Sequence, residues 1–134
     1  MEKRGYASLW TGRVQSQAQL EELLHIAYTE DGDSLPSPFA AYFAIEDYDD
    51  DFREAEFREE GCRNLDELLD GFSYADVLLP RFRDRFQGRS FADVNAVILL
   101  YDFDYAGTIR EAVGTQDVLR FEGSVSYADD GSRF

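Results

Sequence analysis

Two residues of this 134-residue chain stand out as candidates for nucleophilic catalysis, since His25 is the only histidine and Cys62 the only cysteine. A serine or cysteine nucleophile needs a base close to it. His25 lies beside the apolar positions of a predicted helix, where it is interpreted as a residue of the helix flank. Cys62 lies in a loop-like stretch among acidic residues, which disfavour the reactive thiolate. The sequence therefore predicts no catalytic residue.

Sequence patterns that bind metals or phosphates are also missing. A zinc site cannot be built from one cysteine and one histidine, and the chain has no GxGxxG or phosphate-loop motif. Residues 30–33 and 47–51 are rich in carboxylates, but neither segment has the alternation of a calcium-binding EF-hand loop with its terminal glutamate. We therefore expect no metal site and no cofactor.

Pairs of carboxylates could in principle perform acid–base catalysis, as in glycosidases. Such a site needs one carboxyl group with a raised pKa inside an enclosed pocket. The segment DYDDDFREAEFREE is instead typical of a solvated surface. An enzyme would show turnover that disappears when one carboxylate pair is mutated, and no motif favours one.

The strongest feature of the sequence is a run of negative charge from Glu46 to Glu60, with nine carboxylates and two arginines. Like charges packed this closely repel one another, a cost in stability that favours a functional explanation. In a strand, Phe52 would share a face with carboxylates, a mixture that suits protein binding. The hypothetical contact residues are Asp47, Asp49, Asp50, Asp51, Glu54, Glu56, Glu59 and Glu60, helped by Glu30, Asp31 and Asp33.

The net charge of −15 limits the classes of partner. A chain this acidic repels phosphate backbones and anionic membranes, so we expect it to bind neither nucleic acid nor membrane. The same charge accelerates encounters with basic proteins. No secretory signal pattern opens the sequence, and the longest apolar run, Ala96 to Tyr101, is too short to cross a bilayer. These features predict a cytoplasmic protein whose partner is another, basic protein.

Composition and hydrophobic periodicity predict one folded domain over residues 1–134, since 44% of the residues are hydrophobic. Ser16 with Gln19, Asn64 with Glu67, and Ser73 with Asp76 have the spacing of helix N-terminal caps. Strands are expected at residues 7–14, 51–58, 94–105 and 118–127. Helices are expected at residues 17–28, within 39–45, at 65–69 and from Ser73 to about Gln87, where Pro80 marks either a kink or a helix that begins near Leu79.

This order of elements predicts an α+β domain. We expect one mostly antiparallel sheet of about four strands, with the helices packed on one face. The order of the strands in the sheet is left open.

Seven segments of the chain are characteristic, and they are SLWTGRV, SQAQLEELL, EDGDSLPSPFAAYFAI, DYDDDFREAEF, LLDGFSYADVLL, VILLYDFDY and FEGSVSY. The chain resembles in them the Immunity protein 22 family of bacterial polymorphic toxin systems, and this resemblance extends over nearly the whole chain. The resemblance rests on the order and spacing of these segments.

The resemblance implies a non-catalytic α+β protein of the cytoplasm, encoded beside a toxin, that binds and blocks this toxin. It does not identify the toxin. Many toxins delivered to neighbouring cells are nucleases with basic grooves, which an acidic surface could occupy. The alternative hypothesis is an acidic adaptor or nucleic-acid mimic that binds a basic protein of its own cell.

Overall fold

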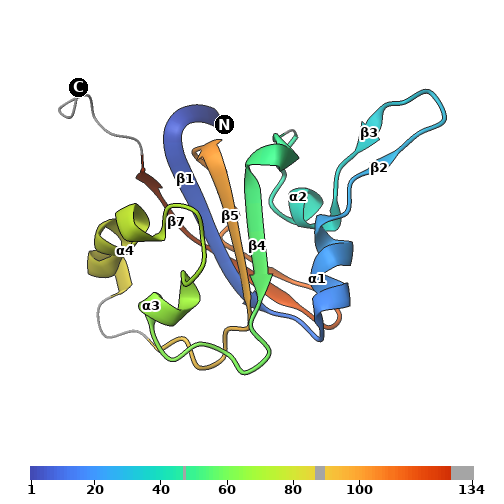
Figure 1. Cartoon of the computed structure of the whole chain (residues 1–134). Helices are drawn as coiled ribbons and strands as arrows, with labels where there is room; N and C mark the ends of the chain where they lie inside the picture. The colour runs from blue at the N-terminus through green and yellow to red at the C-terminus, as the bar shows by residue number, and fades with distance from the viewer. Residues whose placement is uncertain (47, 87–89, 128–134) are drawn as a thin grey trace.

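A computed structural model of the chain describes residues 1–46, 48–86 and 90–127, and its centre is a five-stranded antiparallel sheet. The strand order is β4-β5-β1-β7-β6 (Figure 1). The strands are β1 (Glu2–Arg13), β4 (Arg53–Phe57), β5 (Ala96–Phe103), β6 (Glu111–Val113) and β7 (Val118–Ser126). The α+β class is confirmed, and the sheet has one strand more than the predicted four. The additional strand is β6, whose three residues are too few for a periodic pattern to show.

The helices begin largely where the capping patterns predicted. They are α1 (Gln17–Leu24), α2 (Pro38–Tyr42), α3 (Leu65–Leu68) and α4 (Ala75–Arg83). The backbone N–H of Gln19 donates to the Ser16 hydroxyl (3.1 Å), and that of Glu67 donates to the Asn64 side chain (2.9 Å). These bonds satisfy donors that the first helical turn leaves open. None of the helices in the described ranges is long and apolar enough to cross a membrane.

The helices cover both faces of the sheet, so the prediction that they pack on one face is wrong. Leu20 and Phe39, from α1 and α2, pack with Ile98 on one face. Leu68 and Phe82, from α3 and the end of α4, pack with the opposite face (Figure 1). Every residue from position 96 to 101 is buried. A continuous apolar run of this kind is typical of a strand that is covered on both sides.

Two helix predictions need correction. The first helix ends at Leu24 and not at residue 28, because Ala27–Tyr28 forms strand β2. Helix α4 starts at Ala75 and continues through Pro80, so it does not begin near Leu79. A 3-10 turn at Asp84–Phe86 follows it, and the predicted end at Gln87 lies outside the described residues.

Strand β2 pairs with β3 (Ser34–Leu35) in a small hairpin that projects from the body of the domain (Figure 1). Residues 27 and 28 were predicted as the end of a helix, and no strand was predicted at residues 34 and 35. The strands of the hairpin contain only two residues each, which is too short for an alternating pattern. The hairpin forms one wall of a groove of about 870 Å³.

Candidate functional site

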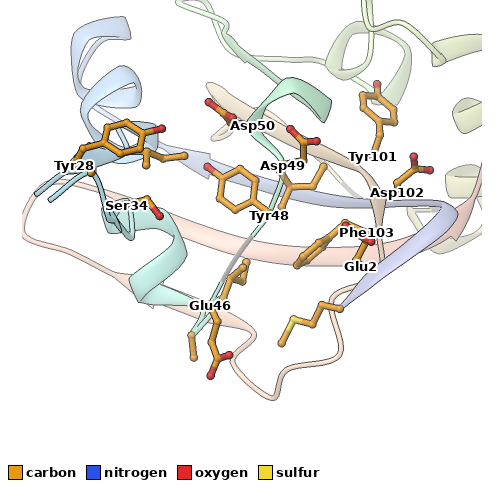
Figure 2. Close-up of a pocket in the computed structure, with 16 residues that line it drawn as sticks. Glu2, Tyr28, Ser34, Glu46, Tyr48, Asp49, Asp50, Tyr101, Asp102 and Phe103 are labelled. Atoms are coloured by element: carbon orange, nitrogen blue, oxygen red, sulfur yellow. The ribbon is translucent and has the colours of Figure 1, made fainter.

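A groove of about 870 Å³ opens between the β2–β3 hairpin and the end of the main sheet (Figure 2). The sheet supplies the first residues of β1 and the last residues of β5. The segment that links α2 to β4 supplies another wall, including Glu46 and Tyr48. Three stretches far apart in sequence thus meet around one cavity.

Carboxylates dominate the polar lining of this groove. Five of the lining residues are acidic, and no Lys, Arg or His is among the described residues that line it. The five are Glu2, Glu46, Asp49, Asp50 and Asp102. Met1 also lines the groove, and its N-terminal ammonium offsets only one of these five negative charges. The groove therefore keeps a negative potential, which attracts cationic groups.

Two of these carboxylates are fixed by the protein itself. Asp102 has a φ of 55° and accepts hydrogen bonds from the Gly5 N–H (2.8 Å) and the Tyr127 hydroxyl (2.7 Å). Asp49 accepts the N–H of Asp51 (3.0 Å) and caps the 3-10 turn η1 (Asp50–Phe52). The side chains of Glu46 and Asp50 have no bonding partner among the described residues, so their charges are available to a ligand.

The turn before β4 concentrates negative charge beside the groove. Asp49, Asp50 and Asp51 are exposed, and oxygens from their carboxylates lie within 4.8 Å of one another. Carboxylates this close repel one another, and a neighbouring cation relieves this repulsion. The turn is therefore suited to contact Lys or Arg side chains of a partner.

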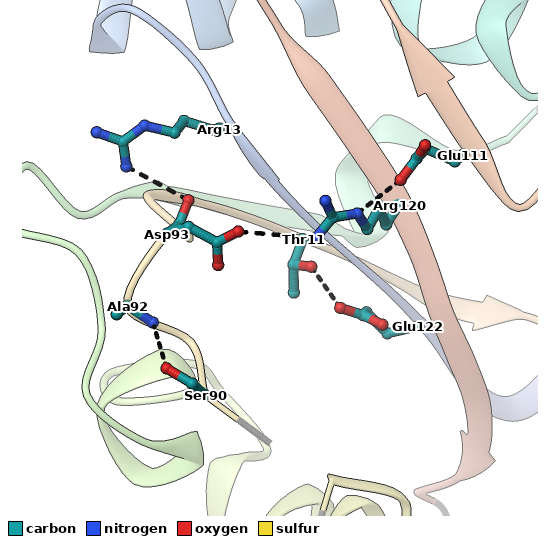
Figure 3. Close-up of polar contacts among 8 residues, drawn as sticks. All are labelled: Thr11, Arg13, Ser90, Ala92, Asp93, Glu111, Arg120 and Glu122. Atoms are coloured by element: carbon teal, nitrogen blue, oxygen red, sulfur yellow. Dashed lines mark hydrogen bonds and ion pairs between the residues drawn. The ribbon is translucent and has the colours of Figure 1, made fainter.

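Acidic residues at the other end of β1 have basic or hydroxyl partners of their own (Figure 3). The Nε of Arg120 donates to Glu111 (2.7 Å), and its Nη1 lies 3.9 Å from Asp93. Thr11 donates to Glu122 (2.5 Å). Carboxylates at that end thus have hydrogen-bond or ion-pair partners, whereas Glu46 and Asp50 in the groove have none among the described residues.

Large apolar side chains are exposed close to the acidic groove. Tyr28, which lines the groove, is 66% exposed, and Leu35 on the paired strand is 46% exposed. Phe52, in η1, is 48% exposed. Aromatic anchors beside unneutralised charge are typical of surfaces that bind proteins.

Glu54 is not among the residues that line the groove, although it belongs to the predicted contact residues. Its carboxylate accepts hydrogen bonds from the Tyr101 hydroxyl (2.5 Å), the Ser73 N–H (3.0 Å) and the Ser73 hydroxyl (2.9 Å). Ser73 is therefore held by Glu54 and does not cap a helix, so the predicted Ser73–Asp76 cap is wrong. The N-cap of α4 is Tyr74, whose side chain makes no capping bond.

The other predicted contact residues are divided among three places. Asp49 and Asp50 line the groove, and Asp51 is exposed in the same turn beside it. Glu30, Asp31 and Asp33 are exposed at the turn of the β2–β3 hairpin. Glu56 is exposed on β4, and Glu59 and Glu60 follow the opposite end of that strand. Asp47 lies outside the described residues. The acidic run is thus not one continuous surface.

Tyr101 lets the Glu54 contact be tested through its pH dependence. Burial and the bond to Glu54 raise the pKa of Tyr101 well above its usual range. A phenol that stays protonated in the folded state but ionises in the unfolded state stabilises the fold below about pH 10, and this stability is lost as the pH rises further. We expect the urea concentration at the midpoint of unfolding to be lower at pH 10.5 than at pH 8. This decrease should be smaller in the Tyr101→Phe variant. An equal fall in both proteins would contradict this role.

The two candidate catalytic residues lie on different faces of the sheet. Cys62 is buried in the core beneath α3 and α4, and this burial raises the pKa of its thiol. His25 is exposed at the end of α1, on the other face. The structure therefore does not bring this thiol and this imidazole together.

Four residues of the groove, namely Glu2, Tyr28, Glu46 and Asp102, were absent from the predicted contact residues, although Glu46 begins the acidic run. Glu2 and Asp102 come from β1 and β5, and Tyr28 comes from β2. The alternation in YDFDY placed Asp102 on the side of its strand that faces away from the tyrosines, but it could not show what this side would meet. The pairing of β1 with β5 brings Glu2 and Asp102 together, and the β2–β3 hairpin adds Tyr28.

Comparison with known proteins identifies the family of this chain. A family model described as Immunity protein 22 matches residues 7–128, which includes nearly all of the sheet and all four α-helices. No curated protein and no solved structure matches the chain. The family match supports a general role in toxin immunity. The chain belongs to the Immunity protein 22 family.

Proposed function

We propose that this protein neutralises a cognate toxin by binding it, with no catalysis of its own, and that the toxin docks on the acidic groove. The observation that carries the proposal is the lining of the groove, with five carboxylates and no Lys, Arg or His among the described residues. Membership of an immunity-protein family makes the partner a toxin. The acidic lining of the groove favours a partner with positive charge.

The toxin domain that fits this groove is basic. Its Lys or Arg side chains would enter beside Glu46 and Asp50, which have no described partner to displace. Nucleases have basic substrate grooves because they bind phosphate backbones. A nuclease-like toxin is therefore the class of partner that the charge favours, and the inhibitor would occupy or flank its substrate site.

Exposed aromatic side chains supply the apolar part of the interface. Tyr28 and Phe52 lie close to the unneutralised carboxylates and can be buried against the toxin. Charge steers the encounter and sets the register, while buried rings provide most of the affinity. We expect the hairpin turn with Glu30, Asp31 and Asp33 to assist the approach of the toxin.

The direct test of function is growth rescue. The C-terminal domain encoded by the neighbouring open reading frame is expressed in cells with and without this protein, and the two purified proteins are then tested for a complex. We expect rescue together with a stable complex whose affinity falls as salt increases. Toxicity that this protein leaves untouched would contradict the immunity role, and would favour a basic partner in the cell itself.

A further inference from the structure

Strand β4 lies at one edge of the sheet. Its pairing with β5 determines which of its backbone groups bond to β5 and which face outward. The N–H of Arg58 donates to the carbonyl of Asn95 (2.7 Å), in register with the pairs Glu56–Val97 and Glu54–Leu99. Because hydrogen-bonded positions alternate along an antiparallel strand, Glu54 and Glu56 bond to β5. The backbone groups of Ala55 and Phe57 therefore face outward, where no described strand pairs with them.

A second hollow, of about 470 Å³, lies between this edge and helix α1. Leu20 and Leu24 form its wall on α1, and Ala55 and Phe57 form its wall on β4. Arg53 also lines it, but its guanidinium donates to the Leu24 carbonyl (3.0 Å) and the Tyr48 hydroxyl (2.9 Å). Gln17, Glu21 and Glu56 border it as well, so the hollow combines apolar and acidic side chains with an open strand edge.

The two sides of β4 differ in chemistry. On the side of α1 the strand presents Ala55 and Phe57, which pack against the apolar cluster there. On the other side it presents Glu56 and also Glu54, whose carboxylate is already hydrogen-bonded to Tyr101 and Ser73. An added strand that matched both sides would have apolar residues alternating with Lys or Arg.

The charge on β4 distinguishes two possible partners of this edge, a second copy of β4 and a basic strand of another protein. Two copies of β4 paired edge to edge would bring Glu54 and Glu56 close to the same residues of the other copy, and adjacent like charges destabilise a sheet. A basic strand would instead place opposite charges side by side. The charges on β4 therefore oppose self-association and favour a cationic strand.

We propose that an extended segment of the cognate toxin, in which basic and apolar residues alternate, pairs with the outer edge of β4 as a sixth strand of the sheet. The inference rests on the proposed function and adds the kind of toxin segment that binds. Tyr28 and Asp50 line both hollows, so the added strand would continue directly into the acidic groove. A single toxin surface could then contact both.

Amide hydrogen exchange of the full-length protein, alone and bound to the neighbouring gene's C-terminal domain, tests this pairing residue by residue. We expect the amides of Ala55 and Phe57 to exchange at least about tenfold more slowly in the complex. The amides of Glu54 and Glu56, which are already bonded to β5, should change less. A complex in which Ala55 and Phe57 exchange as fast as before would overturn the sixth strand while leaving the proposed function intact. Failure to form any complex would overturn both.

A proline at the edge provides an independent test. Ala55→Pro removes an outward N–H that bonds to no strand of the sheet, and edge strands tolerate proline at such positions. We expect binding to weaken about tenfold, as for the loss of a buried hydrogen bond, with little change in melting temperature. Ala55→Ser, which keeps the N–H, is the matched control and should bind within about twofold of the parent. Equal affinities of two folded variants would overturn the proposal. If Ala55→Pro does not fold, the exchange experiment decides.

Discussion

Reversing the charge of Glu46 and Asp50 together, as Glu46→Lys with Asp50→Lys, should weaken toxin binding at least about 100-fold and abolish growth rescue. Both side chains line the groove and have no bonding partner among the described residues, so the change removes attraction without breaking an internal contact. Each lysine also adds repulsion against a basic toxin. The measurement is the dissociation constant at two salt concentrations, and the difference between parent and variant should shrink at high salt.

The matched control for this variant is Asp70→Lys with Asp84→Lys. Both aspartates are exposed and lie in the segment that carries α3 and α4, outside the residues that line the groove. This control changes the net charge by the same amount, so it separates the position of the charge from its total. We expect it to bind within about threefold of the parent. Equal losses in the two double variants would mean that net charge, and not the groove, governs association.

Replacing Trp10 with alanine should lower the free energy of unfolding by about 3–5 kcal/mol. Trp10 is fully buried. Its ring centroid lies 5.0 Å from that of Phe39 and 5.1 Å from that of Phe121. It joins α2 to the sheet, so its loss leaves a cavity where these elements meet. Chemical denaturation measures the change, and we expect the variant to bind its toxin weakly at 37 °C because part of it is unfolded.

Two further substitutions serve as controls for the stability loss expected of Trp10→Ala. Trp10→Phe should cost less than Trp10→Ala, because it retains most of the ring contacts and removes an indole N–H that has no hydrogen-bond partner in the part of the chain that the structure describes. Val113→Ala, at a side chain that is 70% exposed, should change stability by less than about 0.5 kcal/mol. A loss for Trp10→Ala as small as that for Val113→Ala would contradict its central place in the core.

Local sequence signals predicted the elements whose determinants are close in the chain. Ser16 and Asn64 cap α1 and α3 as expected, because each bonds to a backbone group three residues away. The Ser73 cap failed because Glu54, nineteen residues earlier, binds that serine instead. Competition of this kind comes from tertiary packing and leaves no trace in the local pattern.

The candidate site was predictable only in part for the same reason. The run of carboxylates identified Asp49 and Asp50, and the sequence could also show that this charge is unusually dense. It could not show that Glu54 turns inward to Tyr101, nor that Asp102 joins the groove from another strand. These facts depend on which strands are neighbours, and the strand order could not be derived from the sequence.

The most direct test of the central claim is a crystal structure of this protein bound to the C-terminal domain encoded by the neighbouring gene. The account predicts Lys or Arg side chains of the toxin within about 4 Å of the carboxylates of Glu46 and Asp50. It also predicts that Tyr28 is buried against the toxin. A complex that leaves the groove open to solvent, with the toxin seated on the face covered by α3 and α4, would contradict the account.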